Sequence, residues 1–105
     1  MFTDKVGQPI HVGDVIAYGH ALGRCAGMRI GMVLKLAVVE PQFSHESPHR
    51  ITVIGVNDDW ERSPPKLLSK SSTLLYPNRT VVIPRERVPF EYLTILDVFR
   101  SGYVV

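Results

Sequence analysis

The sequence has few of the features that mark several common classes of protein. It contains a single cysteine, Cys25, so the chain cannot form an internal disulfide bond or supply the cysteines of a structural zinc site. Its longest apolar run covers residues 36–39, far below the roughly 18 residues of a membrane-spanning helix. Twelve Lys and Arg against ten Asp and Glu leave a net charge of only +2. Because that excess is too small to indicate a polyanion partner, any such argument has to rest on where the charges lie.

No secretion signal is recognisable at the N-terminus. Residues 1–5 include an acid, and no apolar stretch follows them as a signal peptide requires. We therefore expect a cytoplasmic protein, which also suits the lone cysteine. Hydrophobic residues make up 45% of the chain and charged residues 21%, a composition typical of globular rather than disordered proteins. A chain of 105 residues has the size of one domain, so we predict a single domain over residues 1–105.

Alternation of apolar and other residues predicts most of the secondary structure. Residues 28–39 alternate with a period of two, and residues 50–57 are rich in β-branched side chains, so both are predicted to be long strands. A Gly-Asp turn leads into a shorter strand over residues 14–18. Further short strands are predicted over residues 73–76 and 80–84, on either side of a Pro-Asn turn.

The remaining segments predict two loops and one helix. Residues 19–27 are rich in glycine and are predicted to form a small-residue loop. Residues 57–72 contain two adjacent prolines, which remove strand hydrogen-bond donors, and are predicted to form an irregular loop. Residues 89–99 carry apolar side chains at helical spacing after a proline, which favours a short helix or helical turn. About five strands in a chain of this size have to hide their edges, so we predict a mainly all-β fold, a small barrel with a short C-terminal helical element.

Two segments resemble the opening of an SH3-like or KOW-type barrel. They are Val-Gly-Asp-Val-Ile-Ala-Tyr at residues 12–18 and Arg-Ile-Gly-Met-Val-Leu-Lys at residues 29–35, where a Gly-Asp turn starts one strand and a glycine interrupts the next. The resemblance covers residues 7–36, although residues 19–27 are longer than the usual turn and lack its Lys-Gly pair. It implies a barrel whose loops touch RNA, DNA or polymerase, as in ribosomal proteins and transcription elongation factors. With residues 75–83 included, the chain also looks like small uncharacterised proteins of tailed bacteriophages, which implies an early phage protein acting on DNA or host transcription.

Two groups of cations are candidates for contacts with DNA or RNA. Arg24 and Arg29 belong to the glycine-rich segment, where small residues let a phosphate approach the backbone and guanidinium donors match its oxygens. A flexible connector is the alternative interpretation of that segment. The second group contains the cations of the C-terminal half, for which an ordinary charged surface is the alternative. Its members are Lys66, Lys70, Arg79, Arg85 and Arg87.

Aromatic side chains offer a further way to bind bases. Tyr18, Phe43 and Tyr76 are candidates for a stacking platform, although aromatic residues in strands also serve as core or cross-strand pairs. The cations make a non-enzymatic nucleic-acid-binding module our leading prediction.

A protein-binding role is the competing prediction. Trp60 lies in the irregular loop with Arg62, Pro64 and Pro65, and a loop tryptophan is a typical anchor for a protein partner. Through it the chain would inhibit or redirect a host protein. The alternative is that Trp60 folds back and covers the core. A structural component of a virion is a third possibility.

The sequence gives little support for a metal or catalytic site. His45 and His49 have the spacing that would place them on one face of a helix, but Pro48 lies between them and no third ligand is evident. Cys25 lies near His20 without a group to orient it as a nucleophile. We therefore expect no metal, no cofactor and no enzymatic activity.

Overall fold

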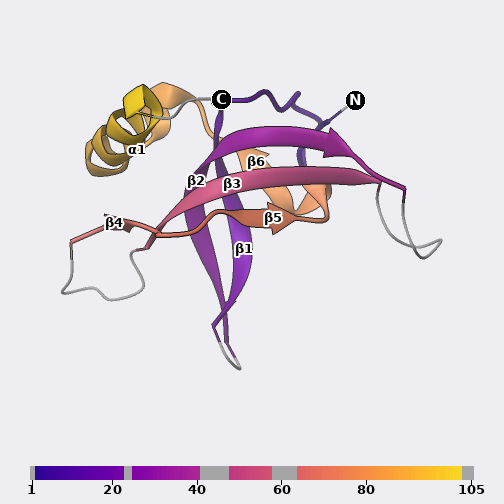
Figure 1. Ribbon diagram of the computed structural model, residues 1–105, viewed down its shortest axis with the longest axis horizontal. Helices are drawn as coiled ribbons and strands as arrows, with labels where there is room; N and C mark the ends of the chain where they lie inside the picture. The colour runs from indigo at the N-terminus through magenta and orange to yellow at the C-terminus, as the bar shows by residue number, and fades with distance from the viewer. Residues whose placement is uncertain (1, 23–24, 41–47, 58–63, 103–105) are drawn as a thin grey trace.

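The fold is a mainly antiparallel β-sheet with one helix at its C-terminal end (Figure 1). The computed structural model describes residues 2–22, 25–40, 48–57 and 64–102, without the side chains of residues 20–22, 25 and 26. The elements are β1 (Val15–Leu22), β2 (Cys25–Val38), β3 (His49–Asn57), β4 (Lys66–Leu67), β5 (Ser72–Leu74), the 3-10 helix η1 (Pro77–Arg79), β6 (Thr80–Val82), the 3-10 helix η2 (Arg85–Arg87) and α1 (Phe90–Gly102). The prediction of a mainly β fold with a C-terminal helical element is confirmed.

The strands form one sheet in the order β4-β3-β2-β1-β6. β5 also pairs with β3, along residues 51–53, while β4 pairs with residues 56–57 of the same strand. All of these pairings are antiparallel. β3 therefore carries two short strands end to end on the edge that β2 does not use.

Two predicted loops are wrong in part. The predicted loop at residues 19–27 consists largely of strand, because β1 and β2 pair from Val15↔Met32 to Leu22↔Cys25. Small residues conceal this ladder in the sequence, since their alternation carries no apolar signal. The predicted loop at residues 57–72 contains β4, which begins just after the two prolines. Proline restricts only the positions where a ladder donor is needed, so a strand can start beyond it.

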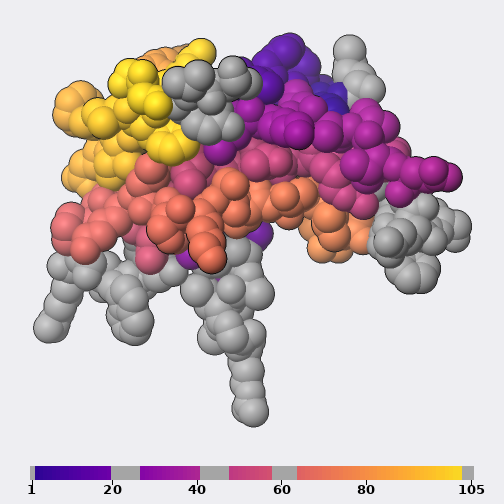
Figure 2. All heavy atoms as spheres, in the orientation of Figure 1, coloured from indigo at the N-terminus to yellow at the C-terminus, as the bar shows by residue number. Residues whose placement is uncertain are grey.

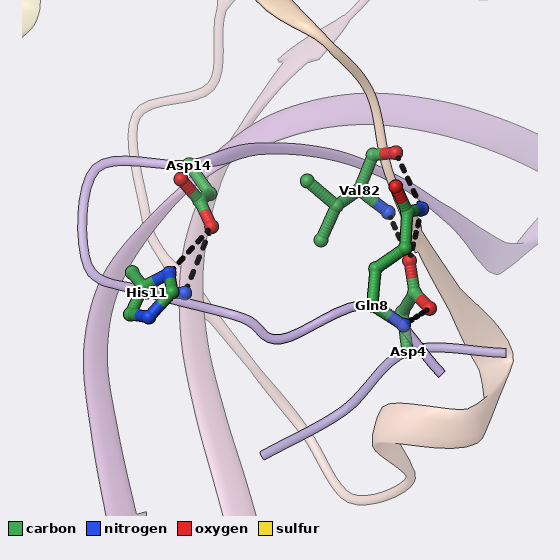
Figure 3. A network of polar contacts seen from close by, with 5 residues as sticks. All are labelled: Asp4, Gln8, His11, Asp14 and Val82. Atoms are coloured by element: carbon green, nitrogen blue, oxygen red, sulfur yellow. Dashed lines mark hydrogen bonds and ion pairs between the residues drawn. The ribbon is translucent and has the colours of Figure 1, made fainter. Parts of the chain in front are cut away.

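The sheet is not closed, so the predicted barrel is not confirmed. The outer edge of β6 is instead occupied by the N-terminal segment (Figure 3). Lys5 N donates to Thr80 O at 2.8 Å, Val82 N donates to Asp4 Oδ2 at 2.7 Å, and Gln8 Nε2 donates to Val82 O at 3.2 Å. These bonds use the backbone groups that a further strand would need, which protects the edge without closing the sheet.

The sheet has a hydrophobic cluster on each face, as the alternation of strand side chains requires. One cluster packs against α1, and its buried members are Val15, Met32, Leu34, Ile54, Val56, Val88 and Leu96. The other lies beneath the N-terminal segment, with Leu74 of β5 and Val82 of β6 packed against it, and its buried members are Ile10, Ile16, Tyr18, Val33, Ile51 and Val53. A register shift between Val33 and Lys35 marks an irregularity in β2.

The Tyr18 side chain of β1 extends across β2 and then β3, because each of these strands has a glycine where the ring passes. Gly31 of β2 pairs with Gly55 of β3. A Cβ atom at Gly31 would lie 2.7 Å from the backbone oxygen of Ile54 and 3.0 Å from Cε1 of Tyr18. One at Gly55 would overlap the Tyr18 hydroxyl oxygen and lie 2.8 Å from Cδ of Arg29. Neither glycine has a positive φ, so close packing rather than backbone conformation requires glycine here: against the neighbouring strand and the tyrosine ring at Gly31, and mainly against Tyr18 at Gly55.

We predict that Gly55→Ala lowers the free energy of unfolding by about 1–3 kcal/mol, because the added methyl group overpacks the Tyr18 site. In a Tyr18→Phe background the loss should be smaller, since the overlapping hydroxyl is gone and the two changes are coupled. Urea unfolding of the four proteins of this double-mutant cycle measures the coupling. Gly102→Ala is the control, since its Cβ would meet nothing within 4 Å. Equal losses in both backgrounds would contradict this packing.

Asp4 supplies the second prediction. Its side chain is only 5% exposed and accepts hydrogen bonds from the backbone N–H groups of Val6, Gln8 and Val82 and from Gln8 Nε2. Burial alone would raise the pKa of Asp4, but these hydrogen bonds together hold it below its ordinary value. The carboxylate therefore stabilises the fold above the ordinary aspartate pKa of about 3.9, and this contribution is lost as the pH falls through the lower folded pKa.

We expect Asp4→Asn to lower the free energy of unfolding at neutral pH by about 1–3 kcal/mol, because an amide places N–H groups against donors. The acid-induced loss of stability should also become smaller than in the wild type. Asp14→Asn serves as the control, since Asp14 accepts a backbone bond from His11 in an exposed turn. Chemical unfolding at several pH values tests both effects. If Asp4→Asn loses as much stability on acidification as the wild type, the role given to Asp4 is refuted.

Candidate functional site

A surface groove lies between β1 and the segment that runs from β5 into η1. Its volume is about 240 Å³, and its lining residues are Tyr18, Gly19, Thr73, Leu74, Leu75, Tyr76, Arg79 and Thr80. The lining combines an apolar floor with hydroxyl groups and one guanidinium. This composition suits a small ligand group that is planar and polar at its edge.

Tyr18 lines the inner side of the groove, and Arg29 lies next to Tyr18 but outside the lining. They are cross-strand partners in β1 and β2. Burial raises the pKa of the Tyr18 hydroxyl, and the positive charge of the Arg29 guanidinium beside it offsets part of that effect. Tyr18 is thus mainly a core residue, which is the alternative interpretation given for it above. Arg29, which the sequence predicts to contact phosphates, is half-buried against Tyr18, and packing therefore restricts its side chain.

The outer wall is built by η1. Thr80 Oγ1 donates to Pro77 O at 2.7 Å, and Arg79 N donates to Tyr76 O at 3.0 Å, so the turn is held from both sides. Pro77 suits the first position of such a turn because its φ is already restricted. The Arg79 guanidinium carbon lies 4.4 Å from the centre of the Tyr76 ring, a cation–π contact that fixes both side chains at the rim.

An exposed polar strip leads into the groove from β4. It consists of Ser69, Lys70, Ser71, Ser72 and Thr73, and Lys66 precedes it on β4. In Figure 2 this part of the chain forms a continuous surface along the lower side of the molecule. The sequence has no acid between Glu61 and Glu86. The charge of the strip is therefore of one sign.

The predicted cations separate into distinct places. Lys66, Lys70 and Arg79 lie on the strip and at the groove. Arg85 of η2 forms an ion pair with Asp97 of α1, and this guanidinium holds the pKa of Asp97 below its ordinary value.

Arg87 is exposed in the same turn as Arg85, next to the helix rather than the groove. Arg24 lies outside the described residues. Three of the seven predicted nucleic-acid contacts, Lys66, Lys70 and Arg79, thus lie on the stretch from β4 to the groove.

The other predicted sites are only partly described. Trp60, Arg62, Phe43 and His45 lie outside the described residues, as do the side chains of His20 and Cys25. Pro64 is exposed and Pro65 is half-buried directly before β4.

His49 takes part in a ring contact rather than a cluster of ligands. Its ring centre lies 4.5 Å from that of Phe2. The described residues contain no group of three or more His, Cys, Asp or Glu side chains that could hold a metal ion. The same residues include no helix with the length and apolar character needed to cross a membrane.

Sequence reasoning missed the hydroxyl groups that accompany the cations. The run from Ser69 to Thr73 carries no pattern beyond a loop and the start of a strand, but its serines flank Lys70 in a stretch without acids. The long acid-free interval is the signal that could have found it. Comparisons with known protein families, with curated proteins and with solved structures found no match. The resemblance to SH3-like barrels and phage proteins stays a prediction.

Proposed function

We propose that this chain is a non-enzymatic nucleic-acid-binding module. Its binding surface would be the groove together with the polar strip, that is, Lys66, residues 69–76 and Arg79. The observation that carries the proposal is the segregation of charge. The described acids are Asp4, Asp14, Glu40, Glu86, Glu91 and Asp97, and all of them lie outside this surface.

The chemistry of the surface matches a phosphate backbone. Lysine and arginine side chains neutralise phosphates, and serine and threonine hydroxyls donate hydrogen bonds to their oxygens. Among the described residues, no ion pair engages Lys66, Lys70 or Arg79, so these cations do not have to break one before binding. These groups would bind a phosphate backbone through their charge and their positions, and the proposed role includes no catalysis.

The finer fold class belongs to the same proposal. An SH3-like module is supported by β1, which pairs on one edge with β2 and on the other with β6. Such a strand links the two halves of a small curled sheet. An action on DNA, RNA or transcription in a phage-infected host remains part of the prediction from the sequence.

Protein binding remains the second candidate. The predicted anchor, Trp60, lies outside the described residues, but α1 exposes Phe90 to 81% and Val98 to 68%. Exposed apolar side chains on one helix are typical of a contact surface. Docking there would depend little on salt, whereas binding to phosphates depends on it steeply.

We predict that a labelled single-stranded oligonucleotide binds the protein with an affinity that falls steeply between about 50 and 200 mM salt. Lys70→Ala and Arg79→Ala should each weaken binding and reduce the slope of log affinity against log salt by about 0.7. Fluorescence anisotropy measures both quantities.

Arg87→Ala is the matched control, because it removes an exposed arginine beside α1. It should leave affinity and slope close to the wild-type values. Absence of binding at the lower salt concentration would overturn the proposed function. An equal loss in the control would refute the assignment of the groove.

A further inference from the structure

We infer that the groove receives one unstacked base, so that the ligand class is single-stranded rather than duplex nucleic acid. This inference rests on the proposed function and adds a base-recognition site to it. It is based on a small concave groove at whose rim the Arg79 guanidinium lies over the Tyr76 ring.

The size of the groove sets the first limit on its occupant. Pockets for drug-sized ligands have volumes of about 300–1,000 Å³, and this groove has about 240 Å³. Its size therefore suits a group as small as a single base. A base inside a duplex has neighbours on both faces and must leave the stack before it can enter such a site.

The lining provides a face and a side for that ring. The Arg79 guanidinium lies over the Tyr76 ring, and both groups are of the kinds that stack on bases: one is an aromatic ring and the other a planar cation. Leu74 and Leu75 add apolar contact, and Leu75 remains 43% exposed in spite of it. A bound base would cover this apolar surface, which is otherwise in water.

Polar groups next to the groove extend the path that a nucleic-acid strand would follow. Thr73 lies both in the lining of the groove and at the end of the polar strip. Lys70 and the serines around it precede it in sequence and are exposed. A nucleic acid with one base in the groove can thus place its neighbouring phosphates along Ser71, Ser72 and Lys70. Acidic peptides could use the cations but would gain nothing from the aromatic face.

The geometry separates stacking from charge. Tyr76 contributes an aromatic surface without charge, whereas Lys70 contributes charge without an aromatic surface. A change at Tyr76 should therefore alter the preference for bases and leave the salt slope unchanged. A change at Lys70 should alter the salt slope and leave the preference for bases unchanged.

The test compares a labelled thymidine or uridine oligonucleotide with a base-free deoxyribose-phosphate oligomer of the same length. The wild-type protein should bind the base-bearing strands about 5- to 150-fold more tightly, the range expected for one stacked base. It should also prefer them to the corresponding duplex. Tyr76→Leu should abolish most of this preference at an unchanged salt slope, and Tyr76→Phe should retain it. Thermal unfolding of both variants verifies that they fold.

Each other outcome has a defined meaning. If the base-free oligomer or the duplex binds as tightly as the single strand, the base site is refuted while the proposed function stands. If none of the nucleic acids binds, the proposed function itself fails. Tighter binding of an acidic peptide than of any oligonucleotide would assign the groove to a protein ligand and overturn the inference. A Tyr76→Phe protein that loses the preference would also contradict it, because the aromatic face is intact.

Discussion

The packing of Tyr18 over Gly31 and Gly55 is the constraint on which the rest of the structure depends. The ring starts on β1 and reaches β3, so it ties together three strands that the backbone connects only in pairs. Any larger residue at Gly55 would push the ring and Arg29 outward. The same ring forms the inner wall of the groove. The shape of the groove is thus set in part by a contact in the core, where close packing leaves little freedom to adjust.

The outer edge of β6 is protected by the N-terminal segment rather than by a further strand. A sheet of this size usually has to protect its edges, and pairing of β5 with β6 would be one way to do so. Asp4, Lys5 and Gln8 satisfy the outer edge of β6 instead. β5 pairs with β3 rather than with that edge, and the segment from β5 to η1 lies opposite β1 at the groove.

Local patterns were enough to predict the long strands and the helix, since period-two and helical spacing are properties of neighbouring residues. They were not enough to predict the pairing of Gly19 with Met28, because small residues carry no apolar signal. They also did not predict the open sheet, whose edge is protected where Asp4 meets Val82 across 78 positions. The same limit applies to the site. Lysine and arginine were recognised by type, but tertiary contacts decide that Arg29 is half-buried and that Arg85 meets Asp97.

The small net charge of +2 conceals an uneven use of charge. Several described acids have structural partners: Asp4 caps β6, Asp14 accepts a bond from His11, and Asp97 pairs with Arg85. Lys66, Lys70 and Arg79 all lie in the acid-free interval between Glu61 and Glu86, and no described ion pair contains them. Charges in physiological salt act over about 8 Å, so a phosphate at the strip would experience the nearest charges more than the net charge of the chain. Local arrangement, rather than total charge, is therefore the physical basis of the proposed binding to a polyanion.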